Sequence, residues 1–236
     1  MNAEQIKDRL KKLGIKIDLS NLQRLSDARN EIEHYLSQEN KDIMGVAIVR
    51  AFPIIRNIID ELQYEPVELL GSQCWNSILA DVKFYQTELS RCKTSFANIQ
   101  WESNTLCRAH NQSEFSCTEC GSPLLRQKNP QNDNAEEIKF ICSHCGKEPE
   151  RKKVIEAATA EVFAGEAYIA MTDGGEEPIN DCPECGNCSY VMEENCCTVC
   201  GFSMKPQTCL VCAEPLTLDE NGLDLCSYHA HVAGKE

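Results

Sequence analysis

The chain has 236 residues, 16 of which are cysteine, and its formal net charge is −14. This length suits one large domain or two modest ones. The N-terminus lacks the apolar segment of a signal peptide and no stretch is as long as a membrane span, so we expect a cytoplasmic protein without a membrane partner. In that reducing compartment, paired cysteines are metal ligands more often than they are disulfides.

The negative charge lies almost entirely in the C-terminal part of the chain. Residues 1–100 carry 13 Lys and Arg against 14 Asp and Glu, whereas residues 101–236 carry 10 against 23. This imbalance disfavours a broad nucleic-acid-binding surface in the C-terminal part, where the acidic residues serve either to meet a basic protein partner or to keep the protein soluble. Any site for a polyanion is expected to be local, and the N-terminal half is favoured as its host.

The apolar residues of the N-terminal part recur at helical spacing, which predicts a bundle of four or five helices. The expected helices cover residues 6–13, 22–36, 43–62, a short stretch that begins at Pro66, and 74–99. Pro53 is expected to kink or split the third of them. Cys74 and Cys92 fall within the predicted helices and are expected to be buried thiols.

A polar string on the second predicted helix combines three groups that can act on a phosphodiester. Asn30 and His34 are four residues apart and share a helix face, and the long side chain of Arg29 can reach the same side. An imidazole can move a proton near neutral pH, and a guanidinium can stabilise charge that develops on a phosphorane. This set of groups is suited to in-line cleavage of RNA without a metal ion.

The string Arg29-Asn30-x-x-x-His34, on an apolar helix within an all-helical region of about 100 residues, resembles the signature of the HEPN superfamily. Members of that family are helical bundles, and many are metal-independent endoribonucleases of toxin–antitoxin, phage-defence and CRISPR systems. The resemblance implies Arg29, Asn30 and His34 as catalytic residues and RNA as substrate. It also implies a homodimer or a HEPN partner, because two such motifs usually face one cleft.

The same string also has a purely structural interpretation. An Arg and a His on an amphipathic helix are commonly surface residues, and Glu33 is placed to form an i,i+4 ion pair with Arg29. Glu31 and Glu33 would repel RNA unless arginines such as Arg24, Arg29 or Arg56 outweigh them. Both interpretations remain open at the level of the sequence.

Three groups of four metal ligands follow in residues 101–236. Each group pairs two steps of the form C-x-x-C or C-x-x-H, and 21, 11 and 13 residues separate the steps in the three groups. The groups are Cys117, Cys120, Cys142 and Cys145; Cys182, Cys185, Cys197 and Cys200; and Cys209, Cys212, Cys226 and His229. Four soft donors on two short loops suit tetrahedral Zn²⁺, and full, thiolate-rich sets are typical of structural zinc. We therefore expect three zinc ribbons with about three Zn²⁺ ions.

Further cysteine and histidine residues leave alternatives open. Two ligand positions have a competitor, Cys196 for Cys197 and His231 for His229. Cys107 and His110 form one more C-x-x-H step and are simple linker residues, half of a further site, or substitute ligands for the first group. Between the first and second ribbons, a helix is predicted over residues 153–170, with Val154 and Ile169 among its packing positions.

The expected architecture is a mainly α, HEPN-like bundle followed by a small-β, metal-stabilised zinc-ribbon array. The expected domains are residues 1–100 (helical), 101–150 (first ribbon), 151–175 (inserted helix) and 176–236 (second and third ribbons). The leading functional prediction is a metal-independent endoribonuclease of a prokaryotic defence or toxin system, whose ribbons recognise a protein partner or a trigger. The alternative is a non-catalytic zinc-ribbon adaptor that dimerises through its helical domain within a larger assembly.

Overall fold

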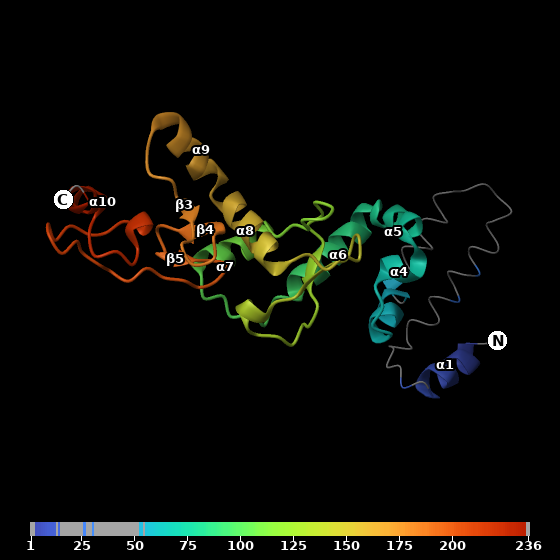
Figure 1. The fold of residues 1–236 in the computed structure, drawn as a ribbon. Coiled ribbons are helices and arrows are strands. Elements are labelled where there is room, and N and C mark those ends of the chain that lie inside the picture. The colour runs from blue at the N-terminus through green and yellow to red at the C-terminus, as the bar shows by residue number, and fades with distance from the viewer. Residues whose placement is uncertain are drawn as a thin grey trace. The chain divides into compact units, whose positions relative to one another are not determined.

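The computed structural model describes residues 3–12, 14, 26, 30, 52–53 and 55–234 (Figure 1). Helices are combined with two small antiparallel sheets. The helices are α1 (Ala3–Lys12), α4 (Pro66–Leu70), α5 (Ser72–Leu79), α6 (Val82–Thr94), α7 (Asn104–Gln112), α8 (Arg151–Val162), α9 (Ala164–Asp173) and α10 (Ser227–Ala233). The strands are β1 (Leu125–Gln127), β2 (Phe140–Cys142), β3 (Ile179–Asp181), β4 (Cys188–Val191) and β5 (Cys196–Cys197). No helix in the described ranges is long and apolar enough to cross a membrane.

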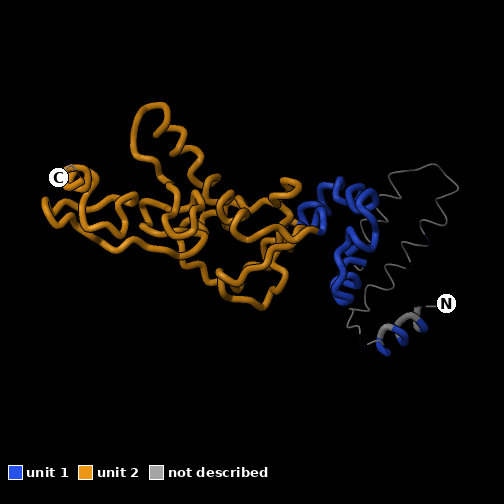
Figure 2. Tube along the Cα trace, viewed as in Figure 1, with its two compact units in different colours: residues 1–88, 143–146 blue, residues 89–142, 147–236 orange. Residues whose placement is uncertain are grey.

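The chain divides into two compact units (Figure 2). The first contains residues 1–88 and 143–146, and the second contains residues 89–142 and 147–236. The division lies inside α6, ahead of the domain boundary expected after residue 100, because Phe96 just after α6 packs with the aromatic side chains of the second unit at centroid distances of 5.9 Å from both Phe115 and Phe140.

An aromatic core organises the described part of the first unit. The ring centroid of Phe52 lies 5.6 Å from that of Trp75 and 4.8 Å from that of Phe84, the latter pair edge to face. Trp75 is fully buried, and its indole Nε1 donates a 2.6 Å hydrogen bond to the carbonyl of Ser143. Gly146 ends the same turn at φ 74°, and a Cβ there would lie 2.6 Å from Val67 Cγ1, so only glycine fits.

The helix predicted to begin at Pro66 is confirmed. Glu65 forms a capping box with Glu68, Pro66 occupies the first turn, and α4 ends at Gly71 with φ 75°. The predicted helix over 74–99 was wrong, because it is broken into α5 and α6 at Ala80 and Asp81. Asp81 Oδ1 accepts from the amides of Lys83 (2.9 Å) and Phe84 (3.2 Å), so this side chain caps the start of α6.

A buried ion pair joins two helical segments of the first unit. Arg56 is 3% exposed and Glu88 4%. Arg56 Nη2 lies 3.1 Å from Glu88 Oε1 and its Nε lies 3.3 Å from Oε2, a bidentate arrangement; Arg56 also pairs with Asp60. Burial opposes the charge of Arg56, but Glu88, Asp60 and Glu65 outweigh it and raise its pKa. Arg56 therefore belongs to the buried core of the described part of the first unit.

The second unit combines both sheets with α7, α8, α9 and α10. β1 pairs antiparallel with β2, and β3, β4 and β5 form an antiparallel sheet in that order. Helix α7 contains Cys107 and His110, and Ser103 caps it by accepting from the Leu106 amide at 3.2 Å. Trp101 stacks with both His110 and Phe115, with ring centroids 5.7 Å and 5.6 Å apart.

Helix α8 packs against the three-stranded sheet. Val154, Ile155 and Ala158 are fully buried, and Thr159 Oγ1 lies 2.8 Å from Thr198 Oγ1. The single helix predicted over 153–170 was wrong, because Phe163 departs from helical geometry (φ −103°, ψ 7°) and separates α8 from α9. Helix α9 continues three residues past the predicted end at residue 170 and stops at Asp173, before Gly174 with φ 79°.

Candidate metal centres

The structure gathers the twelve predicted ligands into three groups of four, which we call clusters 1, 2 and 3. Cluster 1 is Cys117, Cys120, Cys142 and Cys145; cluster 2 is Cys182, Cys185, Cys197 and Cys200; cluster 3 is Cys209, Cys212, Cys226 and His229. Within each cluster, the ligand atoms all lie within 4.8 Å of one another. Each cluster can therefore hold a metal ion.

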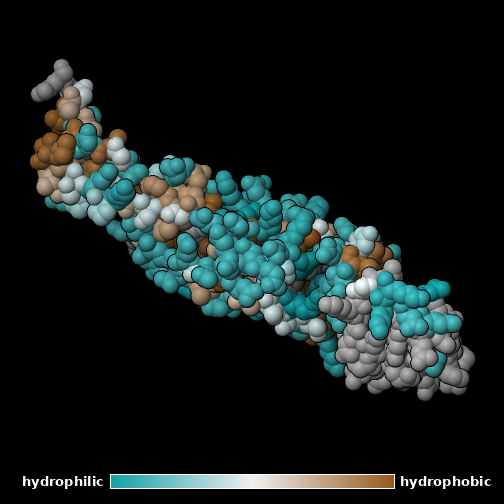
Figure 3. Space-filling model, turned by 90° about the horizontal axis from the view of Figure 1, so that it is seen from below, coloured by the Kyte–Doolittle hydropathy of each residue, from teal (hydrophilic) through white to brown (hydrophobic). Residues whose placement is uncertain are grey.

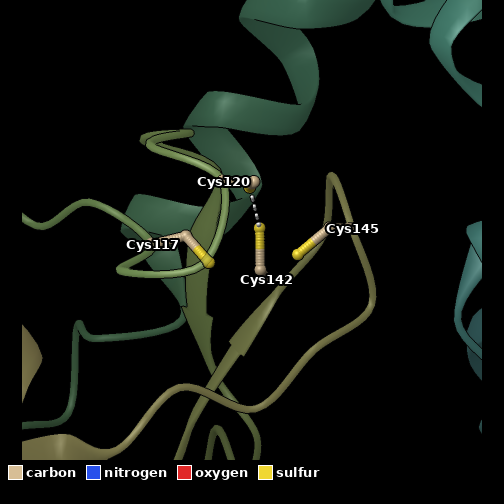
Figure 4. Close-up of side chains that lie close together, drawn as sticks. All are labelled: Cys117, Cys120, Cys142 and Cys145. Atoms are coloured by element: carbon tan, nitrogen blue, oxygen red, sulfur yellow. Dashed lines mark hydrogen bonds between the residues drawn. The ribbon is translucent and has the colours of Figure 1, made fainter.

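Cluster 1 forms where the strands β1 and β2 meet their flanking turns (Figure 4). Cys117 and Cys120 come from the turn before β1, Cys142 ends β2, and Cys145 lies in the turn that follows. The sulfur atoms of Cys120 and Cys142 are 3.7 Å apart. A disulfide would bring them to about 2.05 Å. Four sulfur atoms about 2.3 Å from a central ion lie about 3.8 Å apart, so the observed spacing is that of a tetrahedral metal site.

Clusters 2 and 3 repeat this geometry. In cluster 2, the sulfur atoms of Cys182 and Cys200 lie 3.7 Å apart, as do those of Cys185 and Cys197. In cluster 3, the sulfur atoms of Cys212 and Cys226 lie 4.0 Å apart. The Nδ1 atom of His229 lies 3.5 Å from the Cys209 sulfur and 3.2 Å from the Cys226 sulfur, so Nδ1 is the ligand atom that faces the centre.

Five of the six ligand steps adopt one backbone shape. The amide of the first cysteine donates to the carbonyl five residues later, from Cys117, Cys142, Cys182, Cys197 and Cys209, over 2.8–2.9 Å. The residue after the second cysteine has a positive φ between 59° and 74°, and it is Gly121, Gly146, Gly186, Gly201 or Ala213. Glycine at this position was the local sequence signal for the turn, because left-handed backbone costs glycine little.

Hydrogen-bond donors support the thiolate forms of two ligands. Burial opposes ionisation of Cys197, but donors that include the Ser189 hydroxyl, 3.2 Å from its sulfur, lower the pKa of this thiol. The backbone amides of Cys212 and Cys226 lower the pKa of Cys209 to about 6. The thiolate is the form that binds a metal ion, so these donors prepare the ligands for coordination at neutral pH.

The sixth ligand step differs, because Cys226 and His229 lie at the start of α10. Glu220 fixes this helix start: its Oε1 accepts from the Ser227 amide at 2.5 Å and its Oε2 accepts from the Thr217 amide at 2.9 Å. The Thr217 and Ser227 amides lower the pKa of Glu220 to about 2, which keeps the carboxylate charged. Glu220 therefore anchors the backbone next to Cys226, at the start of the helix that carries both ligands.

Replacing Glu220 with alanine is expected to weaken metal binding at cluster 3 by at least tenfold, because outer-shell partners of metal ligands typically contribute 10- to 100-fold in affinity, about 1.4–2.7 kcal/mol. Asp219→Ala is the matched control, since Asp219 is the exposed neighbouring carboxylate. Competition with a chromophoric chelator measures both variants. Equal affinities in the two variants would show that Glu220 has no part in the site.

The competing residues lie outside the clusters. His231 is exposed on α10, and Cys196 belongs to none of the four-ligand groups among residues 55–234. Cys107 and His110 are one turn apart on α7, where His110 stacks on Trp101 and Asn111 lies 3.7 Å from the Cys107 sulfur. Cys92 is buried as expected, whereas Cys74 is exposed, which corrects the prediction for that residue.

The predicted ribonuclease motif is almost entirely outside the described residues. Arg29 and His34 have no described position, and Asn30 is helical and exposed. Each of the three clusters has four protein ligands, which is the full coordination set of a structural zinc site.

The chain was compared with protein-family models, with curated proteins and with solved structures, and none of the three comparisons found a match.

Proposed function

We propose that this protein is a zinc-stabilised adaptor that docks a basic protein partner through its C-terminal part. The observation that carries this proposal is the complete ligand set of all three clusters, which serves architecture better than catalysis. Zn²⁺ is the proposed metal, because three thiolates with one imidazole, or four thiolates, at tetrahedral spacing are its preferred ligands.

The charge of the same region indicates the kind of partner. Residues 154–234 contain fourteen acidic residues and a single basic one, Lys205. The face of the second unit seen in Figure 3 is largely hydrophilic, with apolar side chains gathered near its C-terminal end. Such a surface repels nucleic acid and attracts Lys- and Arg-rich proteins. Cytoplasmic location and dimerisation through the helical part remain part of this proposal.

The adaptor proposal is tested by reconstitution. The tagged full chain is used to capture proteins from its own cells, and a captured protein is then purified and its affinity measured with the purified chain. We expect saturable binding of a basic protein that survives Arg29→Ala/His34→Ala and is lost when Cys182→Ser/Cys197→Ser removes cluster 2. Binding that survives loss of cluster 2, or a chain that binds duplex DNA more tightly than any protein, would contradict the proposal.

A metal-independent endoribonuclease is the second candidate, and the Arg29-Asn30-x-x-x-His34 string favours it. Its support is the resemblance to HEPN domains together with the helical, exposed setting of Asn30. If it is correct, the protein cleaves total RNA in excess chelator and leaves cyclic phosphate ends, and the Arg29→Ala/His34→Ala variant does not. Equal inactivity of parent and variant would leave the adaptor as the function of the whole chain.

A further inference from the structure

Helix α9 exposes its large apolar side chains, which is unusual for a helix that packs only against its own protein. None of its ten residues is buried. Its large apolar side chains are turned to the surface, since Tyr168 is 64% exposed, Ile169 57% and Met171 76%. A surface helix normally turns such side chains to the core, where each stabilises by about 1.5–3 kcal/mol. The prediction that Ile169 is a packing position was wrong for this reason.

The two sides of α9 differ in a way that defines an outer face. Ala167 and Ala170, which are partly buried, lie on the side of Glu166, whose carboxylate is 3.8 Å from the Arg108 guanidinium on α7. Residues i, i+4 and i+7 of one helix share a face. Ala164, Tyr168 and Met171 have this spacing, so together they form the outer face opposite Glu166.

The N-terminal end of α9 is held rigidly enough to present this face. Phe163, the residue that joins α8 to α9, is fully buried. The guanidinium carbon of Arg108 lies over its ring, 5.2 Å from the centroid, and Arg108 also lies 3.4 Å from Glu193. A buried ring under a cation fixes the direction in which α9 leaves α8. Helix α9 thus continues away from the three-stranded sheet (Figure 1).

The charge around α9 restricts what can cover it. Five acidic residues lie on α9 or within five residues of its ends, and residues 154–204 contain no Lys or Arg. The five are Glu161, Glu166, Asp173, Glu176 and Glu177. A second copy of this chain would bring the same acids to the interface, where like charges repel, and a nucleic acid would be repelled in the same way.

We infer that the outer face of α9 is the docking surface of the adaptor and that its occupant is an amphipathic helix of a partner protein, apolar on one side and flanked by Lys and Arg. Tyr168 and Met171 supply apolar anchors at helical spacing, the mode by which helices recognise one another. The surrounding carboxylates supply attraction and orientation to the basic flanks. This inference rests on the proposed adaptor function and assigns it a site.

The test uses the full chain and a synthetic amphipathic helix with leucine on one side and Lys and Arg on the other, labelled for fluorescence anisotropy. We expect Tyr168→Ser/Met171→Ser to weaken binding at least tenfold, with unchanged circular dichroism and metal content. The matched control is Tyr64→Ser/Val82→Ser, which removes an exposed tyrosine and an exposed aliphatic residue from the first unit. Binding should also weaken as NaCl is raised from about 0.05 to 0.5 M.

Several results would overturn the inference. They are absence of peptide binding, equal binding by the α9 variant, and equal binding of a peptide in which Glu replaces Lys and Arg. A parent chain that dimerises while the α9 variant is monomeric would identify a second copy as the occupant instead. A natural partner that binds the parent and the α9 variant equally would overturn this site yet leave the adaptor proposal standing.

Discussion

The Cys197→Ser variant is expected to bind about two metal ions per chain where the parent binds about three. Cys197 is buried, and its sulfur lies 3.7 Å from that of Cys185 and 3.2 Å from the Ser189 hydroxyl. Serine at this position would therefore remove one of the four ligands of cluster 2. Structural Zn²⁺ contributes about 10–16 kcal/mol of apparent binding free energy in small metal domains, far more than the core of three short strands supplies. We therefore expect β3, β4 and β5 to unfold together.

Cys196→Ser is the control for this experiment, because it changes the adjacent sulfur in the same strand. This variant should still bind about three ions. Its backbone amides should exchange hydrogen as slowly as those of the parent. Elemental analysis gives the metal content, and hydrogen exchange over residues 179–197 reports on the sheet. Loss of an ion from Cys196→Ser with retention in Cys197→Ser would reverse the ligand assignment.

Glu88→Ala is expected to destabilise the first unit by about 3–5 kcal/mol. The substitution leaves the Arg56 guanidinium buried and without its bidentate partner, although Asp60 still pairs with it and Glu65 still acts on its charge. The cost comes mainly from an uncompensated buried charge and less from the lost attraction. Urea denaturation followed by far-UV circular dichroism measures it, with the metal sites kept saturated so that the second unit does not unfold first.

Two comparisons separate this explanation from a simple packing defect. Glu61→Ala removes an exposed carboxylate from the same unit and should change stability by less than about 0.5 kcal/mol. Arg56→Met/Glu88→Leu removes both charges and should recover most of the loss, because a buried pair can be replaced by apolar side chains of similar volume. A double variant as unstable as Glu88→Ala would show that the charge is not the cause.

The metal clusters were predictable from the sequence because their geometry is local. A C-x-x-C step followed by glycine closes its own turn, and two such turns need only a hairpin between them, as β1 and β2 provide. Because each ion takes four ligands, each ligand step pairs with the next step along the chain. Even the choice of Cys197 and His229 followed from the two-residue spacing that the structure shows.

The helix breaks were missed because apolar periodicity continues across them. Asp81 is a capping residue inside an otherwise helical pattern, and this signal was available in the sequence. Phe163 had no such signal: it breaks the helix because its ring is buried beneath Arg108, a contact made by residues 55 positions apart. For the same reason the sequence could not show which side of α9 faces outward, since alanines and larger apolar residues alternate around the helix.

The scarcity of basic residues beyond Lys153 has a practical consequence for anyone who maps this protein. Trypsin cuts after Lys and Arg, and the single candidate within residues 154–234, Lys205, is followed by Pro206, which blocks cleavage. Tryptic digestion therefore returns α8 without its first three residues, α9, α10 and two metal clusters as one long fragment, and amine-reactive cross-linkers have almost nothing to label there. Glutamate-specific proteases and carboxylate- or thiol-directed reagents are the tools that can locate a bound partner on this part of the chain.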